Sequence, residues 1–377
     1  MMLRAHKIRL YPNNRQATYF AKACGVARFA YNWALARSMG LYEQDKLYKF
    51  SEAALRRDLN AIKQEQFPWM LEVTKCAPQL AIKNGLKSAF KNFFAKRADF
   101  PKFHKKGIND SFEISNDQFK VNGSYVQIPK LGNVRLAEEL RYEGKILSAT
   151  VSRTADHWYI SIQVQTARPG PIHGEISENK AGGVDVGVKA LAVLSDGTVV
   201  LGNKPSKKYT KQLRRAQQAL SRKKGARKGE KKSRNYRKQQ CKVGRLHERI
   251  ANSRNDGLHK LSSLLTQNYS LIGIEDLNVK GMVKNHNLAK AIHDQSWSEL
   301  GRQLTYKADT TGSYVHYSDR FFASSQLCSM CGYQNVGTKK LSVREWICPE
   351  CGEVHDRDQN AAENLKQDAI RAVFGAA

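Results

Sequence analysis

Three acidic segments of the chain could together hold metal ions for phosphodiester chemistry. Asp185 lies inside the apolar run Val184-Asp185-Val186, and Glu275 ends the apolar run 271–274. The third segment, residues 356–362, begins a C-terminal helical pattern. Carboxylates among apolar neighbours are costly to bury unless they are paired or bound to metal. Two Mg²⁺ ions about 3.5–4 Å apart can hold the attacking and leaving oxygens of a phosphodiester, so three converging carboxylates would suit its hydrolysis. Strand-end acids that face solvent are the alternative.

The third segment, Asp356-Arg357-Asp358-Gln359-Asn360-Ala361-Ala362, offers two candidate carboxylates. Asp358 directly precedes the Gln-Asn-Ala-Ala run, and we expect it to be the metal ligand. Asp356 is better placed to cap or orient the start of the helix, because a side-chain oxygen there can accept from free backbone N–H groups.

Four cysteines have the spacing of a metal site. Cys328 and Cys331 form one C-x2-C pair, Cys348 and Cys351 form another, and sixteen residues separate the pairs. A glycine follows each pair and lets backbone amides face the sulfurs. Four thiolates match one tetrahedral, structural Zn²⁺ with no open position for catalysis. We therefore expect the site to support structure and nucleic-acid contact; redox-active or fortuitous pairs are the alternatives.

The charge of the chain indicates a polyanionic partner. Lys and Arg total 63 against 34 Asp and Glu, a net charge of +29. Nucleic acid is the default partner for such a surface, and a ribosomal or merely supercharged protein is the alternative. The most basic stretch, 204–249, holds nineteen Lys and Arg against two acids. Apolar residues at helical spacing predict two amphipathic helices around the break at 225–229. The candidate nucleic-acid contacts are Lys207, Lys208, Lys211, Arg214, Arg215, Arg222, Lys223, Lys224, Arg234 and Arg237.

The sequence shows no sign of a secreted protein, a membrane protein or a histidine-based metalloenzyme. The N-terminus lacks the apolar core of a signal peptide, and no stretch approaches the roughly 18 apolar residues of a membrane span. We expect a cytoplasmic protein associated with the bacterial or archaeal nucleoid, with no membrane and no small-molecule substrate. His286, His293 and His355 lie near the acidic segments without an H-E-x-x-H motif, and we expect structural or phosphate-contacting roles for them. The pairs Phe93-Phe94 and Phe321-Phe322 are expected in the core.

Hydropathy periodicity predicts two different halves. In the first half, a strand at 6–11 precedes helices at 15–48, 51–65 and 76–97, and strands follow at 111–114, 118–121, 125–128, 146–151 and 158–164. This order suggests a β-barrel with a helical insertion, and 167–171 is the best linker. The second half predicts strands at 183–188, 190–194, 197–201, 271–274 and 314–317, with a helix at 288–307.

The chain resembles the TnpB family, compact RNA-guided nucleases encoded by bacterial and archaeal insertion sequences and related to type V CRISPR effectors. The match is carried by Gly183-Val184-Asp185-Val186-Gly187, Ile274-Glu275-Asp276-Leu277-Asn278-Val279, the two cysteine pairs and residues 356–364, in the family's order. The resemblance implies an α+β multidomain fold. Its parts would be an RNase H-like RuvC nuclease domain (179–324 and 353–377), an inserted four-cysteine zinc ribbon (325–352), a wedge β-barrel (1–13 and 99–170) and a helical recognition insert (14–98).

The resemblance also implies an activity. Asp185, Glu275 and Asp358 would be the catalytic ligands of Mg²⁺, two ions per site with Mn²⁺ as a substitute, beside one structural Zn²⁺. The partners would be a guide RNA from the transposon end and a double-stranded DNA target. The DNA would be cut next to a short element-specific motif by two-metal-ion hydrolysis. A guide-independent nuclease or transposase and a non-cleaving RNA-guided repressor are the alternatives, and the intact acids argue against the repressor.

Overall fold

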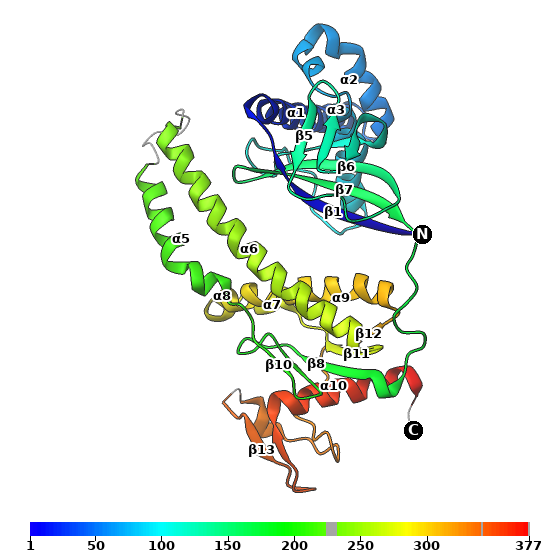
Figure 1. The fold of residues 1–377 in the computed structure, drawn as a ribbon, viewed down its shortest axis with the longest axis vertical. Helices are drawn as coiled ribbons and strands as arrows, with labels where there is room; N and C mark the ends of the chain where they lie inside the picture. The colour runs from blue at the N-terminus through cyan, green and yellow to red at the C-terminus, as the bar shows by residue number, and fades with distance from the viewer. Residues whose placement is uncertain (224–231, 341, 376–377) are drawn as a thin grey trace. The chain divides into compact units, whose positions relative to one another are not determined.

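The computed structural model describes residues 1–223, 232–340 and 342–375 (Figure 1). The chain divides into two compact units, Met1–Arg168 and Pro169–Ala377. Among the described residues, no helix combines the length and the apolar character needed to cross a membrane.

The first unit is built on an antiparallel sheet in the order β2-β6-β7-β1-β5-β4-β3. Strand β1 is central, pairing with β7 from Met2↔Thr166 to Leu10↔Trp158 and with β5 at its far end. The alternating pattern predicted every strand except β5, a short Gly-Asn-Val-Arg-Leu segment with little apolar signal. The strands are β1 (Met2–Tyr11), β2 (Ser111–Ser115), β3 (Lys120–Asn122), β4 (Tyr125–Ile128), β5 (Gly132–Leu136), β6 (Lys145–Thr154) and β7 (His157–Thr166).

Helices fill the chain between β1 and β2. They are α1 (Asn14–Gln44), α2 (Glu52–Gln66), α3 (Cys76–Leu80) and α4 (Lys87–Phe94). Asn13 and Gln16 form a capping box that starts α1, and Phe20 of that helix packs on Phe112 and Trp158 of the sheet. The single helix predicted at 76–97 is interrupted, because residues 81–86 form a π-helical turn between α3 and α4. Gly85 in this turn lies beside the Tyr31 ring, and a β-carbon there would be at ordinary contact distance from it, 3.6 Å.

The second unit contains a five-stranded sheet in the order β10-β9-β8-β11-β12. The β9 pairings are antiparallel, whereas β11 runs parallel to both β8 and β12. The strands are β8 (Ala181–Asp185), β9 (Ala192–Leu194), β10 (Val199–Val200), β11 (Leu271–Glu275) and β12 (Tyr314–Ser318), and a separate hairpin joins β13 (Glu345–Ile347) to β14 (Val354–Asp356). The helices are α5 (Pro205–Arg222), α6 (Arg234–Asn268), α7 (Val279–Met282), α8 (His286–Gln295), α9 (Trp297–Thr311) and α10 (Arg357–Phe374).

The helix predicted at 288–307 is in fact two helices. Ser296 adopts a left-handed conformation (φ 51°) that ends α8 and begins α9. The apolar periodicity continues across this residue, with Ile292, Trp297 and Leu300 all buried in one core. The sequence pattern therefore showed the buried face but not the break.

The two faces of the five-stranded sheet carry different helices. Ile272 and Ile274 of β11 share a core with leucines of α6 and α9, whereas Leu271 shares a core with Ala369 of α10. Figure 1 shows α10 on one side of this sheet and α6 and α9 on the other. Because side chains alternate along a strand, Asp185 and Glu275 lie on the α10 side.

Two glycines allow α10 to lie directly on the sheet. Gly183 and Gly273 are register partners on β8 and β11. A β-carbon at Gly183 would lie 1.8 Å from the Ala362 carbonyl oxygen, and one at Gly273 would lie 2.1 Å from the Leu365 carbonyl oxygen. The contacted atoms are helix backbone, which a rotamer change cannot move aside. Any side chain at either position must therefore displace α10.

We predict that Gly183→Ala destabilises the second unit. Overpacking of this kind costs about 1–3 kcal/mol, and each kcal/mol lowers the melting temperature of a unit this size by about 2–4 °C. Gly174→Ala is the matched control, since its β-carbon would meet nothing within 4 Å. Calorimetry of the three proteins checks this, and equal melting temperatures would contradict the close contact.

Candidate metal and nucleic-acid site

Two of the three predicted acids end neighbouring parallel strands. Asp185 is the last residue of β8 and Glu275 the last of β11, one position beyond the registered pair Val184 and Ile274. Asp358 lies in the first turn of α10, which crosses both strands. The three acids therefore lie at the end of the sheet where β8 and β11 terminate and α10 begins.

The acids interact electrostatically. Burial raises the pKa of Asp185 well above its ordinary value, and the nearby carboxylates of Glu275 and Asp358 raise this pKa further. Burial also raises the pKa of Glu275, although a hydrogen bond from Ser324 Oγ to Glu275 Oε1 (2.6 Å) and the charge of Arg357 lower it. The protein thus concentrates negative charge where water solvates it poorly, which is an arrangement that favours a bound cation.

Arginine holds Asp358. Arg344 Nη1 donates to both Asp358 oxygens at 3.0 and 3.1 Å. Among the described residues, the carboxylate oxygens of the three acids are not gathered within 4.8 Å of one another. Asp356 caps α10 as expected, accepting from the backbone N–H groups of Asp358 and Gln359.

The four predicted cysteines do form a cluster. Their sulfur atoms all lie within 4.8 Å of one another, with Cys328–Cys351 at 3.6 Å and Cys331–Cys348 at 3.5 Å. A tetrahedral Zn²⁺ with Zn–S bonds of 2.3 Å would place its sulfurs about 3.8 Å apart. The spacing and the four-thiolate chemistry both fit that ion.

The two cysteine pairs have the same backbone geometry. In each, the glycine after the pair adopts a positive φ (78° at Gly332, 75° at Gly352) and donates its N–H to the first cysteine's carbonyl at 2.9 Å. Such a φ is open to glycine at little cost. Both glycines thus shape the turn of their pair, and the orientation of backbone amides toward the sulfurs stays a prediction.

Residues of α10 fix the first cysteine pair in place, a role that the sequence did not reveal. Asn360 accepts from the Ser329 N–H (2.9 Å) and donates to the Leu327 carbonyl (2.6 Å). Asn364 also donates to Leu327, and Gln367 donates to the Ser329 carbonyl at 3.0 Å. The spacing 360, 364 and 367 is one helix face, so the periodicity of amides was the available signal.

His355 lies beside the cysteine cluster. It is buried, burial lowers its pKa, and its Nε2 lies 3.0 Å from Cys328 Sγ. Its ring packs against Trp346. His286 and His293 are exposed. The expectation of a core position is wrong for Phe94 and Phe321, which are 68% and 88% exposed.

The predicted basic helices are α5 and α6, which lie side by side (Figure 1). Lys224, together with the predicted break at 225–229, falls outside the described residues. The other nine candidate contacts are exposed: Lys207, Lys208, Lys211, Arg214, Arg215, Arg222, Lys223, Arg234 and Arg237.

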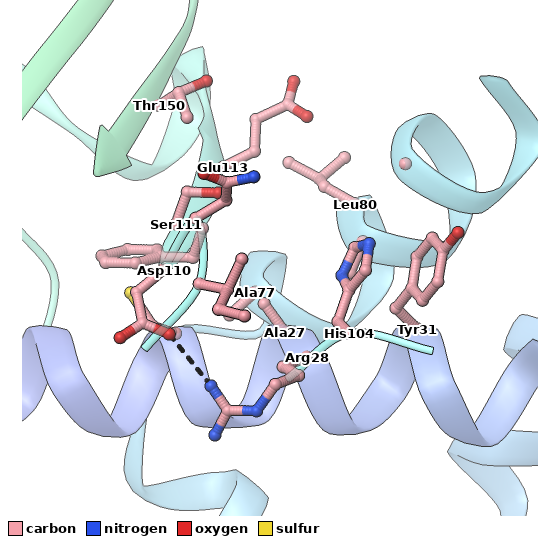
Figure 2. A pocket seen from close by; sticks show the side chains of 16 residues that line it. Ala27, Arg28, Tyr31, Ala77, Leu80, His104, Asp110, Ser111, Glu113 and Thr150 are labelled. Carbon is pink, nitrogen blue, oxygen red and sulfur yellow. Dashed lines mark hydrogen bonds and ion pairs between the residues drawn. The ribbon is translucent and has the colours of Figure 1, made fainter. Parts of the chain in front are cut away.

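A separate cavity of about 180 Å³ lies in the first unit, between α1 and β2 (Figure 2). Tyr31 and His104 stack at 3.8 Å on one side, and Arg28 pairs with Asp110 at 3.1 Å on another. None of the predicted site residues lines it. A second cavity of about 250 Å³ lies beside Glu275 and is also lined by Trp297 and Tyr317.

Family models match most of the chain. They are described as "Probable transposase" (residues 160–286), "Cas12f1-like, TNB domain" (297–365) and "Helix-turn-helix domain" (1–46). The last range holds strand β1 and the single helix α1 rather than two helices. A solved Cas12f1–sgRNA–target DNA complex shares the fold, with a TM-score of 0.60 at 14% identity over 94% of this chain and 83% of that chain.

Curated relatives match along nearly the full length. A protein of Streptomyces pristinaespiralis is 36% identical over 98% of this chain and 90% of its own length. InsQ of Escherichia coli strain K12 is 35% identical over 96% of this chain and 91% of its own length. Both bear the name "Putative RNA-guided DNA endonuclease". Together with the transposase and Cas12f1-like matches, these relatives show that the chain belongs to the TnpB family.

Proposed function

We propose that this protein is an RNA-guided DNA endonuclease of a transposable element that cuts its target beside a short element-specific motif. The observation that carries the proposal is the placement of Asp185 and Glu275 at the ends of neighbouring parallel strands, with Asp358 in the first turn of the helix that crosses both strands. Burial and the nearby carboxylates of Glu275 and Asp358 raise the pKa of Asp185, which well-solvated acids far apart on a surface would not do. The names of the full-length relatives support the same activity.

The fold supports the assignment of each segment of the chain to one of four domains. When the five strands β8 to β12 are numbered 1 to 5 along the chain, their order across the sheet is 3-2-1-4-5, and strand 2 (β9) is antiparallel to its neighbours. This topology supports an RNase H-like RuvC domain at 179–324 and 353–377. The cysteine hairpin would be the zinc ribbon at 325–352. In the first unit, we assign the sheet (1–13 and 99–170) to the wedge domain and the helices between β1 and β2 (14–98) to the recognition insert.

The acids fit Mg²⁺ by their chemistry. Carboxylate oxygens are the ligands that Mg²⁺ prefers, and a divalent cation would relieve the repulsion that raises the pKa of Asp185. Asp185, Glu275 and Asp358 would hold the ions, with Mn²⁺ as a substitute. When bound, such ions polarise the phosphate and stabilise the attacking and leaving oxygens.

The other residues prepare this site. Ser324 orients Glu275 by its hydrogen bond. Arg344 holds Asp358 through both oxygens, so an ion bound at Asp358 must compete with this guanidinium. The Asp356 cap fixes the helix start and thereby the direction of Asp358. In the reaction a water oxygen bonds to phosphorus, the bond to the leaving sugar oxygen breaks, and that oxygen takes up a proton.

The remaining partners follow from charge. The exposed Lys and Arg of α5 and α6 would lie along a nucleic-acid backbone, which releases counterions on binding. Specificity would come from base pairing with a guide RNA from the transposon end. The protein would then need a positively charged channel for the sugar-phosphate backbone rather than a helix that reads bases. The double-stranded target would be opened as the guide pairs with one strand.

We predict that Asp185→Ala and Glu275→Ala each lower cleavage by about 10³-fold or more, while target binding in EDTA stays near wild type. The reason is that these groups hold metal rather than DNA. Asp276→Ala is the control beside Glu275, since Asp276 is half-exposed and pairs with Arg320. Rates and dissociation constants measured on the same complexes check this; an active Asp185→Ala protein would refute the site.

We predict that substitutions of the two acids at the start of α10 have different effects on cleavage and on stability. Asp358→Ala should abolish cleavage, whereas Asp356→Ala should cost about 0.5–2 kcal/mol of stability through the lost cap and leave a reduced but measurable rate, because Asp356 acts on Asp358 only through the helix start. Thermal melting and cleavage assays separate the two effects. An inactive Asp356→Ala protein beside an active Asp358→Ala protein would reverse the assignment.

We predict about one zinc per chain, held by the four cysteines. Cys331→Ser should lose the ion and loosen the second unit, because metal binding contributes directly to folding. Cys241→Ser is the control, since Cys241 lies on α6 outside the cluster. Elemental analysis with limited proteolysis measures both, and a zinc-free wild-type protein that folds and cuts normally would overturn the assignment.

We predict that the purified protein carries a structured RNA, and that exchanging the 3′ segment of this RNA moves the cut to a DNA matching the new segment. The measurement is cleavage of one set of plasmids by complexes made with two different guides. A cut site that stays in place when the guide changes would favour a guide-independent nuclease or transposase. Binding without any cut, under conditions that supply Mg²⁺, would favour a repressor.

A further inference from the structure

The cavity of about 250 Å³ beside Glu275 lies at the end of the five-stranded sheet where β11 and β12 terminate. Val186, Ile274 and Leu300 line it and belong to the apolar core that the sheet shares with α6 and α9. In open sheets with parallel strands, ligands bind beyond the carboxyl ends of the strands. The cavity has that position, and Glu275, one of the proposed metal ligands, forms part of its wall.

Two aromatic side chains, Trp297 and Tyr317, also line the cavity. Trp297 is buried, whereas Tyr317 is 42% exposed. Tyr317 pairs in register with Ile274, which places both side chains on the α9 face of the sheet. The Tyr317 hydroxyl donates to the Gly301 carbonyl at 3.3 Å, and a β-carbon at Gly301 would lie 3.1 Å from this hydroxyl. The Tyr317 ring is thus held by β12 at one end and by α9 at the other, and it stays accessible.

The size and lining of the cavity suit one planar ring system. Pockets that bury a drug-sized ligand measure about 300–1,000 Å³, and this cavity is smaller. An accessible aromatic ring beside apolar side chains is a stacking surface for a nucleobase, because every base has a π-face. The net charge of +29 favours a base that belongs to a nucleic acid over a free aromatic metabolite. DNA held at the metal site would bring its bases to this wall.

We propose that this cavity receives the nucleobase next to the phosphodiester that is cut, and that the Tyr317 ring stacks on that base. This inference rests on the proposed nuclease function and adds a base subsite to it. Glu275 would hold metal against the phosphate and also lines the cavity, so the phosphate and the base of one nucleotide would be held at adjoining places. Stacking tolerates any base, so the subsite positions the DNA strand and leaves sequence specificity to the guide RNA.

The test removes either partner of the stack, using the complex that carries its own RNA. Guide-matched DNA is made with an abasic site at each position flanking the mapped cut. Tyr317→Ala removes the ring, Tyr317→Phe keeps it, and Tyr314→Ala is the matched control. Tyr314 lies on the same strand β12 and is 47% exposed, but the described residues that line the cavity do not include it. The readouts are single-turnover cleavage rates and melting temperatures.

We expect an abasic site at one flanking position to slow the wild type by about 5–150-fold, the factor that corresponds to the loss of one base–aromatic stack. Tyr317→Ala should lose a similar factor on intact DNA, and the abasic site should slow it no further. Tyr317→Phe and Tyr314→Ala should respond to the abasic site as the wild type does. A wild-type rate that no abasic site changes, or a Tyr317→Ala protein that keeps the full abasic effect, would overturn the proposal.

A second measurement needs no cleavage. The probe is a short single-stranded DNA containing 2-aminopurine, a base whose fluorescence falls when it stacks, added to each complex with Ca²⁺ in place of Mg²⁺. The wild type and Tyr314→Ala should quench the probe more than Tyr317→Ala does, and equal quenching by all three would contradict the subsite. If the wild-type complex cuts no guide-matched DNA yet shows this difference, the nuclease function fails and the base subsite stands.

Discussion

The direct contact between α10 and the five-stranded sheet is the constraint on which the second unit depends. Gly183 and Gly273 present bare backbone to the helix, and the carbonyls of Ala362 and Leu365 fill the space where side chains would otherwise be. A helix held this closely cannot slide or rotate by a residue without a clash. Its first turn is therefore fixed relative to the ends of β8 and β11, and Asp358 with it.

The same helix connects the acids to the cysteine cluster. Its amides at 360, 364 and 367 hold the backbone of the first cysteine pair. The β13–β14 hairpin returns to the helix start, since Asp356 pairs in register with Glu345 and the Arg357 N–H binds the Arg344 carbonyl. A metal held by the cysteines would thus stiffen the element that carries Arg344 and its bond to Asp358. By this route a closed thiolate site, with no open coordination position, would help to fix the position of Asp358.

Much of this arrangement was predictable from sequence because it is local. The cysteine spacing, the Asp356 cap and the alternating strands are set by residues close in the chain, and the structure agrees with them. Breaks inside apolar patterns were not predictable, as at Ser296, because a left-handed residue can leave the buried face intact. The roles of Arg344, Arg357 and Ser324 were missed for another reason. Each depends on partners 14 to 49 residues away, and a charged or hydroxyl side chain alone does not indicate its partner.

The site also departs from what stability alone would favour. Asp185 is partly buried, and the carboxylates of Glu275 and Asp358 lie near enough to raise its pKa further than burial alone does. The charge of Arg357 lowers the pKa of both Asp185 and Glu275, yet no ion pair joins Arg357 to either acid among the described residues. The Arg344 carbonyl holds the Arg357 N–H, the Asp356 cap holds the next two N–H groups of α10, and β8 and β11 hold Asp185 and Glu275, so the backbone fixes the position of each charge. Acids that the backbone holds close together cannot move apart to relieve their repulsion, so a divalent cation bound between them is the means of relief that their chemistry favours.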